Sequence, residues 1–338
     1  MNKFILITTV LLLSIPVIGQ QKFDGKYWSS LEPVDTKVPS EKTLEIVLKE
    51  PLMPEKGFLR RDSSDIIRVN GKYYIWYTKV YKDQSSFPEG AAGSVWYATS
   101  PDGHQWEERG ECLPRGDAGC WDDAGVYTPN ILVYKGKYYL GYTASKLPFP
   151  DHDKYTSAIG MAVSDSPDGP WKKLGNNPVI KPSLTPGTPD GIIVDDTIFI
   201  VKEGKIWMYY KGNPNSGTVE NPRRTFGNTF LLAATAERPE GPYTKLNKVL
   251  HRGHEGVVWK TEDGGIGSLA TSRGPLRYMH STNGVDFKAV YKLTTPKAPS
   301  IYRPDFEEGN KGFRPTWGVS QKSKRVGLHR MEFVWPEE

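Results

Sequence analysis

The sequence has few of the residues that soft-metal and redox sites require. Among 338 residues there are two cysteines and six histidines, and no Cys-x-x-Cys spacing occurs. A structural zinc site or a thiol redox centre is therefore not expected. The chain also lacks a P-loop, a dinucleotide-binding fingerprint, a Gly-x-Ser-x-Gly elbow and a His-Glu-x-x-His helix. These absences, with no pattern of long helices, argue against nucleotide-binding α/β folds.

The two cysteines lie close together in the sequence. Cys112 and Cys120 flank a loop that contains Gly116, Asp117 and Gly119. A local disulfide is sterically feasible over that spacing, and two free thiols are equally compatible with it.

The charge pattern excludes a nucleic-acid footprint. The formal net charge is +5, and it is spread along the chain in short clusters. Such a balance favours a solvated surface and tolerates an anionic or sulfated polymer. We therefore expect no nucleic-acid partner.

The first twenty residues have the features of a secretory signal peptide. A short basic start, Met1–Lys3, precedes an apolar run over Phe4–Ile18 and a small-residue region at Gly19-Gln20. The run is short for a membrane span, and no later segment is apolar enough to cross a bilayer. We expect a signal peptide over residues 1–20, no membrane insertion after its cleavage, and a periplasmic or secreted protein.

A repeated hairpin is the main structural signal. Residues 65–78 return as residues 130–143 and, more weakly, as residues 196–210. Each copy reads as an apolar strand, a tight turn that ends in glycine, and a second strand of alternating aromatic and smaller residues. The turn glycines lie roughly 65 to 70 residues apart, which suits a four-stranded blade and one functional loop.

A second repeat lies in the other half of each period. Strand, glycine-containing turn and aromatic residue recur at residues 95–106, 159–171, 231–243 and 277–287. Repeated sheets with little helix between them indicate an all-β propeller. We expect residues 21–338 to form a single domain with an N-terminal extension at about 21–54. Residues 326–335 are expected to close the last blade by pairing with Leu44–Leu48, which removes a free edge.

Acidic residues recur at the start of successive blades, where strands approach the propeller axis. Asp62, Asp195 and Glu255 stand where a buried strand would favour apolar residues. Carboxylates gathered at one place repel each other and lose solvation, so their recurrence favours chemistry over packing. One group that activates water and one that protonates a leaving oxygen constitute the machinery of glycoside hydrolysis.

These blade starts resemble those of a known enzyme group. Arg61-Asp62-Ser-Ser, Thr128–Tyr139, Val194–Phe199 and Glu255-Gly256 are similar to motifs of glycoside hydrolase family 43 and its relatives. The Arg-Asp-x-Ser start and the His254-Glu255 pair resemble glycoside hydrolase family 117 more closely. The resemblance covers most of residues 55–275 and implies a five-bladed β-propeller. Family 117 removes α-1,3-linked 3,6-anhydro-L-galactose from agar oligosaccharides.

The resemblance implies a role for each acid. Asp62 would be the general base that activates water, and Asp195 would orient the substrate and tune the pKa of its neighbours. His254 would be the general acid if family 117 chemistry applies. Glu255 would be the general acid under family 43 chemistry, and otherwise a substrate or metal contact. Both assignments imply inversion.

Three further residues are expected to contact the sugar. Arg61 precedes the proposed base, Trp121 offers a stacking face, and Thr128 lies at the start of the second blade.

We expect an oligosaccharide partner and no cofactor for the chemistry. A structural divalent cation near Thr128–Asn130 stays open, because oxygen ligands gather there. Family 117 members carry an N-terminal helical segment that helps form dimers; four prolines interrupt the corresponding region here, so a homodimer also stays open.

Four functions are compatible with these residues. The first is an exported, exo-acting glycosidase of family 117 type that acts on agar oligosaccharides. The second is an arabinosidase or xylosidase of family 43 type, and the third is a catalytically silent sugar-binding propeller. A phosphorylase of related fold is the fourth.

Overall fold

A computed structural model describes most of the chain. The described residues are 25–31, 38, 41–81, 92–146, 156–224, 227–254, 256–270, 276–294, 297–307, 309, 311–321 and 327–337. The expected signal peptide lies outside them.

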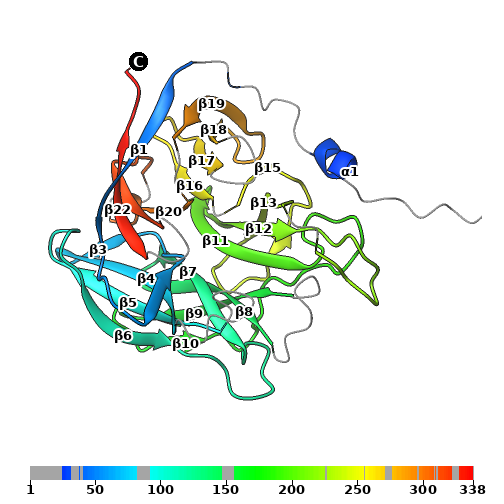
Figure 1. Cartoon of the computed structure of the whole chain (residues 1–338), viewed down its shortest axis with the longest axis horizontal. Helices are drawn as coiled ribbons and strands as arrows, with labels where there is room; N and C mark the ends of the chain where they lie inside the picture. The colour runs from blue at the N-terminus through cyan, green and yellow to red at the C-terminus, as the bar shows by residue number, and fades with distance from the viewer. Residues whose placement is uncertain are drawn as a thin grey trace, which may run out of the picture.

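The strands form five consecutive blades of four or five strands each, and within each blade neighbouring strands are antiparallel (Figure 1). The first blade contains β2 (Phe58–Arg61), β3 (Ile67–Val69), β4 (Lys72–Tyr81), β5 (Ser94–Ser100) and β6 (Glu107–Leu113). The second contains β7 (Gly125–Tyr134), β8 (Lys137–Ser145), β9 (Ala158–Ser164) and β10 (Lys172–Lys173). The third contains β11 (Ile193–Lys202), β12 (Lys205–Asn213), β13 (Phe230–Ala236), β14 (Thr244–Lys245) and β15 (His251–Arg252).

The last two blades share a continuous sheet. The fourth contains β16 (Val257–Lys260), β17 (Ile266–Ala270), β18 (Arg277–Ser281) and β19 (Lys288–Leu293). The fifth contains β20 (Lys297–Ile301), β21 (Trp317–Gln321), β22 (Leu328–Val334) and the N-terminal strand β1 (Thr43–Pro51). The fold is thus the expected all-β, five-bladed propeller.

The N-terminal strand closes the ring. β1 pairs antiparallel with β22, with Ile46 opposite Phe333 and Leu48 opposite Met331, and it also touches β19. Figure 1 shows the blue β1 and the red β22 side by side. The predicted closure is therefore confirmed. It also places part of the extension expected at about 21–54 inside the fifth blade, where it covers a sheet edge that would otherwise be unpaired.

The predicted hairpin turns have the backbone that their residues favour. The paired turn residues have φ values of 50° and 78° at Asn70-Gly71, 50° and 76° at Lys135-Gly136, and 52° and 76° at Glu203-Gly204. Two successive positive φ values define the type I′ turn, whose twist matches that of the flanking strands. The local sequence alone therefore sets the register of these three hairpins.

The core consists of five apolar clusters, one between each pair of neighbouring blades. The cluster between the first two blades contains Trp76 and Tyr142, and the cluster between the second and third contains Phe199 and Tyr210. The other three join the remaining neighbours, including the fifth blade and the first. The repeated aromatics thus fill the spaces between blades, as expected of propeller packing.

Little of the described chain is helical. α1 (Gly25–Ser30) places Trp28, which is 0% exposed, in the cluster between the second and third blades, and η2 (Pro304–Phe306) follows β20. No helix among the described residues is both long and apolar enough to span a membrane.

The two cysteines do not form a disulfide. Cys112 and Cys120 are free thiols. Burial raises the pKa of Cys112.

Candidate active site

The first three blades begin with the same backbone irregularity. After Arg61, Tyr127 and Asp195, each inner strand gains one residue relative to its partner strand before pairing resumes. The extra residues are Asp62, Thr128 and Asp196, with φ values of 48°, 44° and 52°. A bulge of this kind redirects a side chain that regular pleating would place elsewhere, and an L-residue at positive φ is uncommon and often functional.

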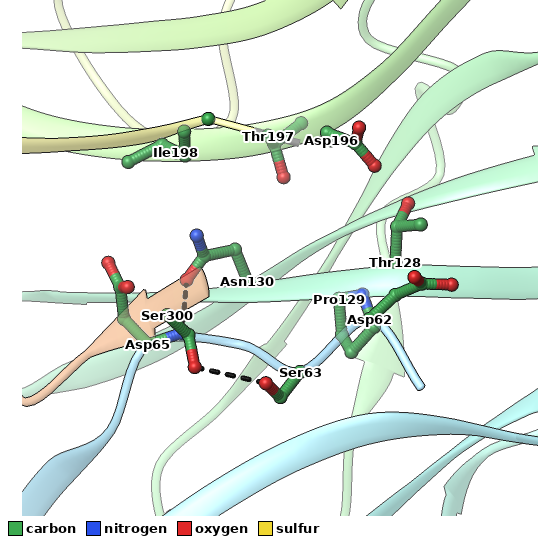
Figure 2. A pocket seen from close by; sticks show the side chains of 11 residues that line it. Asp62, Ser63, Asp65, Thr128, Pro129, Asn130, Asp196, Thr197, Ile198 and Ser300 are labelled. Atoms are coloured by element: carbon green, nitrogen blue, oxygen red, sulfur yellow. Dashed lines mark hydrogen bonds between the residues drawn. The ribbon is translucent and has the colours of Figure 1, made fainter. Parts of the chain in front are cut away.

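These three residues meet in one cavity at the propeller axis. All five blades contribute to its lining, which consists of Asp62, Ser63, Asp65, Thr128, Pro129, Asn130, Asp196, Thr197, Ile198, Gly256 and Ser300. Figure 2 shows Asp62, Thr128 and Asp196 towards one end of this axial cavity, and Asp65 and Ser300 towards the other. Its volume is about 40 Å³, enough for one or two water molecules.

Asp62 is held by its sequence neighbour. Arg61 donates from Nε to Asp62 Oδ2 over 2.5 Å, and its Nη2 lies 3.3 Å from Oδ1. The backbone N–H of Asp62 donates to Gln321 Oε1 of the fifth blade over 3.3 Å. Both members of the ion pair are buried, with 8% and 9% of the residue exposed for Arg61 and Asp62. Arg61 therefore holds in place the carboxylate that lines the cavity.

Asp195 lies behind the cavity wall. Its Oδ1 lies 2.9 Å from Thr128 Oγ1 and 2.7 Å from Thr143 Oγ1, and it accepts the N–H of Asp196 over 2.8 Å. Lys211 Nζ lies 3.2 Å from Oδ2. Burial alone would raise the pKa of Asp195, but Lys211 and the hydroxyl donors outweigh it and hold this pKa well below its usual range. Asp195 is thus a partly buried, ionised group, with 13% of its side chain exposed.

The next residue, Asp196, faces the cavity. Sequence reasoning did not select it, although Thr128 and Asp196 each precede their hairpin glycine by eight residues. Lys211, which is 7% exposed, forms ion pairs with Asp196 and Asp195 together. One buried cation therefore serves two adjacent carboxylates, which reduces their mutual repulsion.

A second buried ion-pair network lies next to the cavity. Asp65, which lines it, pairs with Arg303 Nη1 over 2.9 Å, and Arg303 also makes two 2.8 Å bonds to Asp305. Arg303 is 0% exposed and donates from Nη2 to the carbonyl oxygen of Phe199. Burial raises the pKa of Asp65 against the opposing effect of Arg303. The guanidinium thus ties the fifth blade to the first and third.

The structure places the remaining predicted residues at different distances from the cavity. Thr128 lines it, whereas Trp121 stacks on Tyr142 at 5.8 Å and is not part of its lining. His254 is partly buried and lies two residues before Gly256, which lines the cavity. Glu255 lies outside the described residues. Their roles stay predictions.

The described residues do not fit a metal ion. They contain no group of three or more His, Cys, Asp or Glu side chains able to hold one. Asn130 Oδ1 already accepts the N–H groups of Asp65 and Ile131, and Asp65 pairs with Arg303. The side-chain oxygens of Asn130 and Asp65, next to the cation site expected near Thr128–Asn130, are thus already engaged.

Comparison with known proteins agrees with this geometry. The family described as glycosyl hydrolases family 43 matches residues 59–225. A solved family 117 glycoside hydrolase from the marine bacterium Zobellia galactanivorans is 29% identical, with a TM-score of 0.71 over 86% of this chain and 90% of that chain. The chain is thus similar in sequence and fold to glycoside hydrolases of families 117 and 43.

Two curated relatives of this chain come from Bacillus subtilis. An extracellular endo-α-(1→5)-L-arabinanase is 32% identical over 131 residues, which is 33% of this chain and 26% of that protein. An arabinoxylan arabinofuranohydrolase is 25% identical over 275 residues, which is 71% of this chain and 48% of that protein. The chain thus spans between about a quarter and a half of these relatives.

Proposed function

We propose that this protein is an exported, exo-acting glycoside hydrolase that removes a terminal α-1,3-linked 3,6-anhydro-galactose from agar-type oligosaccharides with inversion. The observation that carries the proposal is the similarity to the family 117 structure, because it extends over 86% of this chain and 90% of that one. The His254-Glu255 pair and the signal-like leader support the same reading.

The axial cavity suits the attacking half of the reaction. A water molecule there lies beside Asp62, whose carboxylate takes one proton as the water oxygen bonds to the anomeric carbon. The bond from that carbon to the leaving oxygen breaks, and His254 gives the leaving oxygen a proton. The sugar inverts because water attacks from the face opposite the leaving group.

The other carboxylates supply the electrostatics. Inverting hydrolysis passes through a transition state with positive charge on the sugar ring. Asp195, whose pKa is held low, keeps a negative charge behind the cavity wall, and Asp196 presents its carboxylate to the cavity. Fixed charge of this kind stabilises the transition state without reorganisation. Lys211 holds the pair in place.

A second candidate function is an arabinosidase of family 43 type. The family 43 match over residues 59–225 and the two relatives named for arabinan and arabinoxylan favour it. In that case Glu255, rather than His254, donates the proton to the leaving oxygen. Asp62 keeps the same role in both candidates.

The deciding experiment compares substrates with the purified full chain. Neoagaro-oligosaccharides and arabino-oligosaccharides are incubated separately, and products are identified by mass spectrometry, with the anomeric form read by early-time NMR. Release of one anhydro-galactose per chain with inversion supports the proposal. Release of pentose from the arabino-oligosaccharides alone contradicts it and supports the second candidate.

A further inference from the structure

A second cavity lies between the fourth and fifth blades. Its volume is about 340 Å³, and it is lined by the ends of β16, β18 and β22 and by the connection from β20 to β21. Pockets for small ligands begin at about this size. Nothing in the proposed hydrolysis uses it.

This cavity lies at the far face of the propeller from the axial cavity. β16 begins beside Gly256, which lines the axial cavity, and ends at Lys260, directly before Thr261, which lines the second cavity. Similarly, β21 ends at Gln321, which contacts Asp62, while β22 runs back towards Trp335. At about 3.3 Å per residue, the two cavities are roughly 15 Å apart.

The wall of the second cavity is aromatic. Trp259 stacks on Tyr278 at 5.5 Å, and Trp335 packs edge-on against both rings. Trp259 is 1% exposed, and its Nε1 has no hydrogen-bond partner among the described residues. The three rings therefore give the second cavity an apolar, aromatic wall.

The rim of the second cavity carries charges of both signs. Arg314 lies over the Trp335 ring at 5.5 Å and has Glu262 at 3.8 Å, while His280 lies 3.1 Å from Asp263. The side chains of Glu262 and Asp263 are 65% and 62% exposed. Two carboxylates would repel a phosphate, while hydroxyl groups can donate to them and accept from Arg314.

We propose that this far-face cavity is a second, non-catalytic carbohydrate-binding site that holds a polysaccharide segment. A sugar has apolar C–H faces and a rim of hydroxyl groups, which match an aromatic wall with acceptors and donors at its edge. The site anchors the enzyme on its polymer while a chain end is held at the mouth of the axial cavity. This inference rests on the proposed function only in that the protein binds a glycan. It does not depend on whether His254 or Glu255 is the catalytic acid.

The test is affinity electrophoresis of the full chain in native gels that contain soluble agar, κ-carrageenan, debranched arabinan or xylan. We expect at least one polymer to retard the protein. Arg314→Ala and Glu262→Gln should each weaken that retardation at least threefold, and the pair at least tenfold. Arg109→Ala is the matched control, because Arg109 is also a partly exposed arginine paired with a neighbouring glutamate.

Hydrolysis of short oligosaccharides is measured in parallel, and we expect it to be unchanged in Arg314→Ala and Glu262→Gln. The proposal is overturned if no polymer retards the wild-type protein, or if both variants migrate like the wild type in every gel. If the proposed function is wrong, the hydrolysis assay shows no release of anhydro-galactose, whereas a wrong binding-site proposal shows in the gels. The two outcomes are therefore distinguishable.

Discussion

Asp62 and Asp196 occupy equivalent positions in the first and third blades. Each is the extra residue of a bulge, each has a positive φ, and each lines the axial cavity. The carboxylate from the first blade is paired with Arg61, whereas that from the third is paired with Lys211. The same kind of bulge therefore presents two carboxylates to one small cavity, and each is paired with a different cation.

Asp62→Asn should abolish most of the activity. The amide has nearly the shape of the carboxylate but cannot take a proton from water, so kcat should fall about 10²- to 10⁴-fold. Initial rates on the preferred oligosaccharide measure this, with circular dichroism to check folding. Asp286→Asn, an exposed aspartate paired with Lys248, is the matched control. A turnover number within tenfold of wild type would remove Asp62 from the role of base.

Lys211→Met should move the acid limb of the kcat/KM profile to higher pH. Lys211 lowers the pKa of Asp195, so without it this pKa rises and the carboxylate is protonated at a higher pH. We expect a shift of about one pH unit or more, measured from pH 4 to 9. Lys205→Met is the control, because Lys205 begins the same strand but forms an exposed pair with Glu237. An unshifted limb would show that this carboxylate does not govern activity.

Arg303→Met should destabilise the protein by about 3 to 5 kcal/mol, because it leaves two buried carboxylates without their cation. Asp65 and Asp305 are both 2% exposed. Urea unfolding measures the loss, and Arg68→Met, at an exposed arginine, is expected to change stability by less than 1 kcal/mol. Adding Asp65→Asn to Arg303→Met should cost less than the sum of the two single changes, since the residues share one network.

His251 should make stability depend on pH. It is 3% exposed, donates from Nδ1 to the carbonyl oxygen of Arg252 and accepts from Ser268 at Nε2. Burial, with Arg277 nearby, lowers its pKa to about 4. The unfolded chain takes up a proton below about pH 6.5 and the folded chain does not, so stability falls as pH drops from 6.5 to 4. The full loss is on the order of 3 kcal/mol.

His251→Gln tests this directly. The variant should lose stability at pH 7 but should show a flatter dependence of unfolding free energy on pH between 4.5 and 7. Urea unfolding at five pH values for both proteins measures the two slopes. Parallel slopes would mean that other groups cause the acid sensitivity.

His254→Gln and Glu255→Gln should separate the two candidate acids. A general acid is needed most when the leaving oxygen is a poor leaving group. If His254 is the acid, His254→Gln should slow oligosaccharide cleavage about 10²- to 10⁴-fold but slow an aryl glycoside with a good leaving group much less. Glu255→Gln should then affect both substrates to a similar extent. The reverse pattern would assign the acid to Glu255.

Local sequence specifies much of the fold. The pairs Asn70-Gly71 and Lys135-Gly136 determine type I′ turns by themselves, because glycine accepts a positive φ without steric cost. Those turns set the register of the hairpins. The alternation of aromatic and smaller residues after each turn then determines which face of the strand packs between blades. The closure of the ring by β1 and β22 could also be predicted, because an alternating strand at each end of a propeller has an edge to cover.

Local sequence is enough to specify the hairpins, the propeller and the recurrence of acids at blade starts, because turn chemistry and strand periodicity are local. That Asp196, rather than Asp195, lines the axial cavity depends on how the strands pair in three dimensions. Consecutive strand residues point to opposite sides, and the bulge after Asp195 sets which one faces inward. The tertiary structure also brings Arg303 to Asp65 across 238 positions of sequence, a contact that exists only because the fifth blade closes against the first.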